Sequence, residues 1–114
     1  MVSINALEGG AVGITGKYLY VVMMDVEPEK EVLFNEVYDN EHIPALLKVP
    51  GVLSATRFKT GSADRPKYLA IYELINSEVP ETEAFIRAAE SGRWPHEIRP
   101  FTKNRSRTLY DKIS

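Results

Sequence analysis

Residues 31 to 58 read EVLFNEVYDNEHIPALLKVPGVLSATRF, and the change of pattern inside this stretch decides the fold. Its first part repeats apolar residues at helical spacing, on one stripe made of Leu33, Phe34, Val37 and Tyr38. Because Pro44 has no N–H to donate to the carbonyl of residue 40, we expect the helix to end or kink just after His42. A short second turn is predicted over 44–51, and residues 52–60 then read as a strand.

The flanking segments complete an alternation of strands and helices. Runs rich in β-branched and aromatic residues predict three further strands at 17–26, 67–75 and 105–113. A second helix is predicted over 81–92, closing on a glycine, and residues 93–104 are expected to form a loop because they hold two prolines. The resulting order is βαββαβ. It predicts a ferredoxin-like fold of the α+β class, with a four-stranded antiparallel sheet and two helices on one face.

Length and composition limit the class of protein. The chain has 114 residues, and we expect one domain over 17–114 behind a flexible, glycine-containing N-terminal arm over 1–16. A net charge of -2 gives no reason to expect a nucleic-acid partner, and no apolar run approaches the ~20 residues that cross a membrane. The chain has no cysteine, which excludes disulfides and thiolate nucleophiles and fits a cytoplasmic protein.

The predicted strands are apolar on both faces, which a single layer of helices cannot cover. Helices on one side of the sheet leave an opposite side that carries the apolar residues Leu19, Val21, Met23, Leu69 and Ile71. A second copy of the same sheet is the cover that we expect, so the sequence predicts a homodimer.

His42 is the sharpest candidate for chemistry. Phe34, Tyr38 and His42 are spaced four residues apart, so they share the side of the helix that faces the sheet. At the helix end beside Pro44, an imidazole could exchange protons near neutral pH, with Tyr38 assisting it. The alternatives are that His42 is a structural cap of the broken helix and that Tyr38 is a core aromatic with its hydroxyl at the rim.

A second set of side chains is predicted to bind a substrate. Its members are aromatic or charged residues near the expected cleft, namely Phe34, Tyr20, Arg57, Tyr72, Trp94 and His96. Arg57 or Arg107 could hold a carboxylate or phenolate, or could instead be paired with an acid at a strand end or at the dimer rim. Trp94 either plugs an edge of the core or belongs to a lid formed by the loop after the second helix.

No metal site is predicted. Asp39 and Glu41 flank His42, but their spacing does not match the two-histidine metal motif, and we expect both acids on a solvated face or at the helix end. The glycines near the N-terminus follow no strand, so they form no phosphate-binding loop. We therefore expect no cofactor.

These segments together resemble the dimeric α/β-barrel superfamily, near its EthD-like branch. Phe34, Tyr38, His42 and Pro44 fit the aromatic, tyrosine and His-x-Pro pattern of that branch's first helix, and the resemblance covers roughly residues 17–112. It implies a ferredoxin-like fold whose sheets pair in a dimer. The superfamily includes small monooxygenases, polyketide cyclases and muconolactone-type isomerases. A histidine at the end of the first helix is catalytic in some lactone isomerases of this fold, but the cysteine that accompanies it in one group is absent here.

The residues and the resemblance together predict a protein that binds a small organic metabolite. The principal hypothesis is a cofactor-free enzyme that performs isomerisation, cyclisation or a related proton transfer on an aromatic or lactone-like compound. In this hypothesis His42 is the acid or base. The alternatives are a non-catalytic binding or accessory module and a small cofactor-free monooxygenase.

Overall fold

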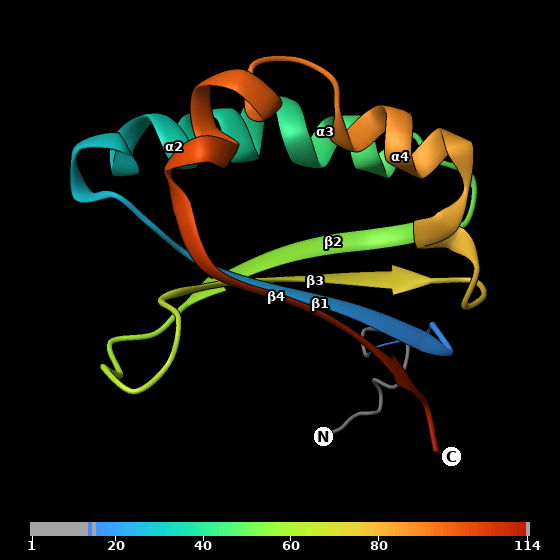
Figure 1. The fold of residues 1–114 in the computed structure, drawn as a ribbon. Coiled ribbons are helices and arrows are strands. Elements are labelled where there is room, and N and C mark those ends of the chain that lie inside the picture. The colour runs from blue at the N-terminus through green and yellow to red at the C-terminus, as the bar shows by residue number, and fades with distance from the viewer. Residues whose placement is uncertain (1–13, 15, 114) are drawn as a thin grey trace, which may run out of the picture.

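A computed structural model describes residue 14 and residues 16–113, and within them the chain folds as a sheet with helices on one face (Figure 1). The strands are β1 (Tyr18–Val26), β2 (Val52–Lys59), β3 (Tyr68–Leu74) and β4 (Thr102–Asp111). They form one antiparallel sheet in the order β2-β3-β1-β4. This order is that of the split βαβ arrangement, so the predicted ferredoxin-like fold is confirmed.

The first helical run does not stop at the proline. It passes from α2 (Glu31–Val37) through a π-helical segment, η3 (Tyr38–His42), into α3 (Ile43–Leu47). The N–H of Ile43 reaches back five residues to the carbonyl of Tyr38. Of the two outcomes expected at Pro44, an end or a kink, the end after His42 does not occur, because the helical run continues into α3. Its irregularity is a π segment, in which the N–H that Pro44 lacks is tolerated.

The segment predicted as a loop over 93–104 is largely helical. It contains a π-helical turn, η5 (Trp94–Ile98), and a 3₁₀ turn, η6 (Arg99–Phe101), before β4 begins three residues earlier than predicted. Each of its two prolines lies near the start of a turn, where no N–H donor is required, so proline begins these turns instead of preventing them. The pairing of β1 with β4 shifts register between Met23 and Asp25, opposite Asn104, whose φ is 55°. Beyond this irregularity the first residues of β4 continue to pair with β1.

The second long helix, α4 (Glu83–Ala89), is shorter than predicted and packs beside α3 over the sheet (Figure 1). The side chain of Thr82 caps it by accepting the N–H of Phe85 at 3.2 Å. Between helices and sheet lies an apolar core, and its largest fully buried side chains are Tyr72, Phe34, Leu46, Leu74, Ile98 and Val37. Short 3₁₀ turns, η2 (Pro28–Lys30) and η4 (Val79–Glu81), lead into α2 and α4.

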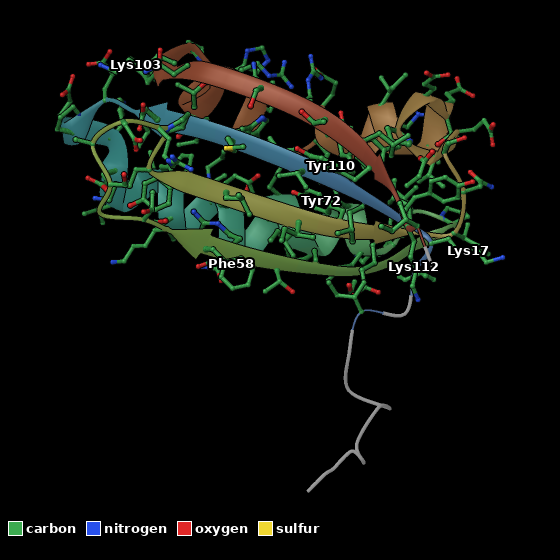
Figure 2. The ribbon with its side chains drawn as sticks, turned by 90° about the horizontal axis from the view of Figure 1, so that it is seen from below. Lys17, Phe58, Tyr72, Lys103, Tyr110 and Lys112 are labelled. Atoms are coloured by element: carbon green, nitrogen blue, oxygen red, sulfur yellow. The ribbon has the colours of Figure 1, made fainter. Side chains whose placement is uncertain are left out.

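The other face of the sheet has no helix over it. Figure 2 looks onto this open face, with Phe58 on β2 and Tyr110 on β4 at its two sides. Phe58 and Tyr110 are 54% and 51% exposed. The register pairs Val21 with Ile71 and Met23 with Leu69 across its centre, as the alternation of the strands requires. An apolar surface of this kind in one chain calls for a partner.

The predicted flexible arm over 1–16 falls almost wholly outside the described residues, and it stays a prediction. Of its described residues, Gly16 is buried and its N–H donates to Oε1 of Glu73 on β3 at 3.0 Å. Among the described residues, no helix is long and apolar enough to cross a membrane.

Candidate functional site

A cavity of about 350 Å³ lies between the helices and the covered face of the sheet. Its aromatic wall consists of Tyr20, Tyr38, Tyr72, Phe85 and Trp94. Smaller apolar residues complete the wall, namely Val22, Met24, Leu46, Pro80, Ile86 and Ala89. The ionisable members are His42, Glu90, Arg99, Arg105 and Arg107. A cavity whose wall combines apolar and aromatic side chains with several polar ones can hold a small molecule, and this volume lies near the low end of the usual range for such sites.

The π segment brings His42 to this wall. The imidazole is only 7% exposed and stacks on the indole of Trp94, with ring centroids 4.4 Å apart and planes at 24°. The edge of Tyr38 meets it at 5.0 Å. Nδ1 of His42 is buried and has no hydrogen-bond partner within the described part of the chain, and the side chain caps neither of the helical segments that it adjoins. The capping alternative therefore finds no hydrogen bond to support it.

The electrostatic surroundings of His42 differ from the expectation. Burial, and after it the positive charges of Arg99 and Arg105, lowers the pKa of His42 to about 4. The imidazole is therefore neutral at pH 7, and the expected exchange of protons near neutral pH is wrong for the free protein. Desolvation and like charge both disfavour the imidazolium form, which sequence spacing alone does not reveal.

The cavity wall that carries His42 also carries the phenol groups of Tyr38 and Tyr72. The hydroxyls of Tyr38 and Tyr72 lie 3.4 Å apart, and either can donate to the other. Burial raises the pKa of Tyr38 and raises that of Tyr72 well above its ordinary value. Both hydroxyls therefore keep their protons at neutral pH. Because their mutual hydrogen bond uses only one of the two protons, the other proton is available to a ligand.

Trp94 is held over the cavity by an ion-pair network. Glu41 accepts the N–H of Arg93 at 3.0 Å and its Nε at 2.6 Å, and Nη2 of Arg93 also donates to Glu36 at 2.8 Å. These contacts tie the start of η5 to the first helical run. The indole lies 5.1 Å from Tyr38 and 6.1 Å from Phe34, so it both closes the core and forms a wall of the cavity.

The structure brings five of the eight residues predicted for the site onto the cavity, namely Tyr20, Tyr38, His42, Tyr72 and Trp94. It does not place Phe34, Arg57 and His96 there. Phe34 is completely buried beneath the cavity wall, because the helix turns its ring toward Tyr68 of β3 at 4.9 Å. His96 points into solvent from η5.

Arg57 lies on the other side of Tyr38, outside the cavity. Its guanidinium stacks on the ring of Tyr38 at 4.3 Å from the centroid and donates to Asp39 and Asn35, both at 2.8 Å. The paired alternative for Arg57 is therefore the one that the structure shows. Asp39 and Glu41 are engaged by arginines in the same way, away from the imidazole.

The sequence reasoning missed Arg99, Arg105 and Glu90, and it left Arg107 undecided. Arg105 and Arg107 alternate with Ser106 and Thr108, so one face of β4 carries both guanidinium groups, and the register places Arg107 opposite Val22 of the cavity wall. The R-S-R pattern was a usable signal for these two. Arg99 donates from Nη2 to Oε2 of Glu90 at 2.5 Å, a contact between α4 and η6 that no spacing in the sequence indicates. In the described part of the chain, no three His, Asp or Glu side chains gather as a metal site.

Comparison with known proteins rests on structure. No family model matches the sequence, and a comparison with curated proteins finds no match. An ethyl tert-butyl ether degradation (EthD) family protein from Bacillus halodurans superposes with a TM-score of 0.62 at 14% identity, covering 84% of this chain and 99% of that one. The resemblance to the EthD-like branch is confirmed at the level of the fold.

Two other solved structures show how varied proteins of this fold are. SnoaB, a cofactor-independent oxygenase from Streptomyces nogalater, matches with a TM-score of 0.61 at 21% identity, over 85% of this chain and 93% of that one. A dimeric protein of unknown function with a ferredoxin-like fold, from Bacteroides fragilis, matches with a TM-score of 0.57 at 15% identity, over 87% and 99%. At such identities the likeness establishes the fold alone.

Proposed function

We propose that this protein binds a small aromatic metabolite in the cavity and moves a proton to or from it without a cofactor, with His42 as the base. One observation carries the proposal: a buried imidazole on the cavity wall whose Nδ1 has no partner. Buried polar atoms nearly always have a hydrogen-bond partner, so an exception beside a cavity points to a ligand. The indole stacked on the imidazole and the three tyrosines of the cavity wall suit an aromatic ring.

The neighbouring groups fit a proton transfer next to a carbonyl. A neutral imidazole has a free lone pair with which to accept a proton from carbon. The phenol pair of Tyr38 and Tyr72 can donate its spare hydrogen bond to the oxygen on which negative charge develops. Acid, base and aromatic wall therefore belong to one cavity, and together they suit isomerisation or cyclisation through an enolate.

The proposal can be tested with 2-tetralone, an aromatic ketone with acidic C–H groups beside its carbonyl. Exchange of these protons in D₂O, followed by NMR, should be faster with the protein than in buffer. His42→Ala should reduce the protein-dependent rate by ~10²–10⁴-fold, the usual contribution of a positioned base. His96→Ala is the matched control, because His96 is exposed and outside the cavity, and it should leave the rate unchanged.

Other results would favour the alternatives. Binding of 2-tetralone by calorimetry without faster exchange would contradict the catalytic half of the proposal and leave a binding module. Oxygen uptake that depends on both protein and substrate would favour a cofactor-free monooxygenase, and the exchange rate would then be insensitive to His42→Ala.

We further propose that the protein functions as a homodimer through the open face of the sheet. The apolar centre of this face, made by Val21, Met23, Leu69 and Ile71, has no helix of the described part of the chain over it (Figure 2). Neighbouring side chains bury Val21, and the other three residues remain partly exposed. A second copy presents the same apolar surface, which makes the contact self-complementary. The dimeric protein from Bacteroides fragilis with a similar fold agrees with this proposal.

A further inference from the structure

One end of the cavity is strongly cationic. Arg99, Arg105 and Arg107 lie there and are called the arginine rim below, with Glu90 as the acidic side chain among them. The chain as a whole has a net charge of -2. Three guanidinium groups against one carboxylate at this place therefore form a local excess of positive charge that general composition does not explain.

The arginine rim is incompletely neutralised. Arg99 donates to Glu90 through Nη2 at 2.5 Å and through Nη1 at 3.2 Å. Arg105 and Arg107 make no ion pair or side-chain hydrogen bond with any described residue. Partial burial, together with the charges of Arg107 and Arg99, lowers the pKa of Arg105. Arg105 and Arg107 are thus exposed and unpaired within the described part of the chain, so water solvates them and an anion can reach them.

A dimer through the open face would not supply that anion. Along β4, Ser106 and Thr108 are opposite Met23 and Val21 and point to the open face, whereas Arg107 is opposite Val22 and points to the cavity. Arg105 shares the side of Arg107, two residues away. A carboxylate paired with Arg105 and Arg107 would therefore lie on the helix side, which is the side of the cavity.

We propose that the cavity accepts an aromatic carboxylate, whose anionic group is bound by Arg105 and Arg107 while its ring lies against Trp94 and the tyrosines. This inference rests on the proposed function and adds the charge of the ligand to it. A guanidinium group offers two parallel N–H donors to a carboxylate, which gives both strength and orientation. The carboxylate would thereby fix the end of the ligand that faces β4 and turn the remainder toward His42.

Binding of an anion would also change the environment of the base. Arg99, Arg105 and Arg57 all lower the pKa of His42, and Glu90 alone is an acid that raises it. A carboxylate beside Arg105 would offset part of this positive charge. The imidazole would then accept a proton more readily in the complex than in the free protein.

The test compares two probes of nearly the same shape, 2-naphthoate and its neutral amide 2-naphthamide, by titration calorimetry. Wild-type protein should bind the carboxylate at least ~10-fold more tightly than the amide, as expected for a hydrogen bond to a charged group. Arg105→Gln should remove most of this preference, because it should weaken the binding of the carboxylate far more than that of the amide. Arg107→Gln provides a second variant, with the same expectation, in case the first does not fold.

Lys103→Gln is the matched control. It removes one positive charge from the same strand, but Lys103 lies at the end of β4 far from Tyr110 (Figure 2) and is not on the cavity wall. This variant should keep the wild-type preference, whereas a loss in it would mean that general charge, and not the arginine rim, attracts the carboxylate.

The outcomes separate the two proposals. Equal affinities for the two probes in the wild-type protein would overturn the inference about the carboxylate and leave aromatic binding intact. A preference for 2-naphthoate that survives in both Arg105→Gln and Arg107→Gln would also overturn it, because another group would then hold the anion. Binding of neither probe would overturn the carboxylate and the aromatic ligand together.

Discussion

The two faces of the sheet are both rich in apolar side chains. They differ in the polar side chains that lie among these apolar ones. Beneath the helices, His42, a pair of tyrosine hydroxyls and the arginine rim surround the cavity. On the open face, the central positions of β1 and β3 are apolar, and β4 contributes the uncharged side chains of Ser106, Thr108 and Tyr110. Both faces need cover, but only the first has groups that could act on a ligand.

This difference shows that a pattern of apolar residues identifies a buried surface but not its function. Alternating apolar residues mark a surface to be buried, and they do so equally well for a core and for an interface between copies. A buried histidine without a hydrogen-bond partner costs free energy unless something else binds it, whereas an apolar position has no such requirement. A group of this kind therefore distinguishes the face proposed to bind a ligand from the face proposed to associate with a second copy.

The largest expected effect is on the open face. Ile71→Asp should convert the proposed dimer to monomer. It should raise the dissociation constant by at least roughly a thousandfold, because even one buried unpaired charge costs about 3–5 kcal/mol and a symmetric dimer would bury two. Sedimentation equilibrium across a range of protein concentrations measures this change. Ile71 is only partly buried in the single chain, so the monomer should keep its fold. Met23→Asp, on the neighbouring strand, should have the same effect.

Val32→Asp is the control for this comparison. It makes a closely similar chemical change on α2, where the side chain is 86% exposed, and it should leave the association state unchanged. If the wild-type protein sediments as a single 12.9 kDa species at micromolar concentration, the open face has another partner or none.

The next effect belongs to the covered face and depends on pH. The pKa of His42 is about 4 in the folded chain, against an ordinary value of 6.5, so between these values the unfolded chain binds more protons. Stability therefore rises with pH through this window and is lost as pH falls. From pH 7.5 to pH 5 the free energy of unfolding should fall by about 2 kcal/mol, measured by urea denaturation at fixed protein concentration.

His42→Phe should flatten this slope, because phenylalanine can stack on Trp94 without taking up a proton. His96→Asn, at an exposed position, should retain it. The measurement stops at pH 5 because the carboxyls whose pKa values are lowered, Asp25, Glu31, Glu41, Asp64 and Glu90, take up protons below that pH. An unchanged slope in His42→Phe would mean that His42 takes up its proton in the folded state at about the same pH as in the unfolded chain.

Most of the fold could be predicted from the sequence, because strand alternation and helical spacing are local signals. The order of strands and helices followed from them, and so did the side of the helix that carries Phe34, Tyr38 and His42. The π segment could not be predicted, because a missing donor at Pro44 is compatible with an end, a kink or a wider turn, and packing against the sheet selects among these. For the same reason, the two prolines after Trp94 predict a loop over 93–104, although each of them lies near the start of a helical turn in the structure.

The site was less predictable, because it depends on contacts between distant segments. The sequence placed Tyr38 and His42 correctly on one side of a helix, but it could not show that Trp94 stacks on the imidazole from fifty residues away. Arg57 was drawn into the site by its charge, whereas its actual partners on α2 and η3 neutralise it outside the cavity. Nor does any local pattern give the low pKa of His42, which depends on burial and on arginines from three other elements.

The smallest effect compares one chemical change on the two faces. Tyr72→Phe removes a hydroxyl from the covered face, and Tyr110→Phe removes one from the open face, where the side chain is 51% exposed. Tyr72→Phe should lower the rate of 2-tetralone exchange about tenfold, the size of one hydrogen bond of roughly 1.4 kcal/mol, because Tyr38 then lacks its partner and the phenol pair has one proton fewer.

Tyr110→Phe should leave the exchange rate unchanged, since the hydroxyl of Tyr110 has no contact with the cavity. Neither change should affect sedimentation, because neither adds a charge to the open face. If the two variants lose the same amount of exchange activity, the loss is not specific to the covered face. The phenol pair would then be a structural feature of the core with no role in exchange. If Tyr72→Phe alone loses activity and Ile71→Asp alone loses the dimer, two consecutive residues of β3 serve the two faces separately, as the alternation of a strand permits.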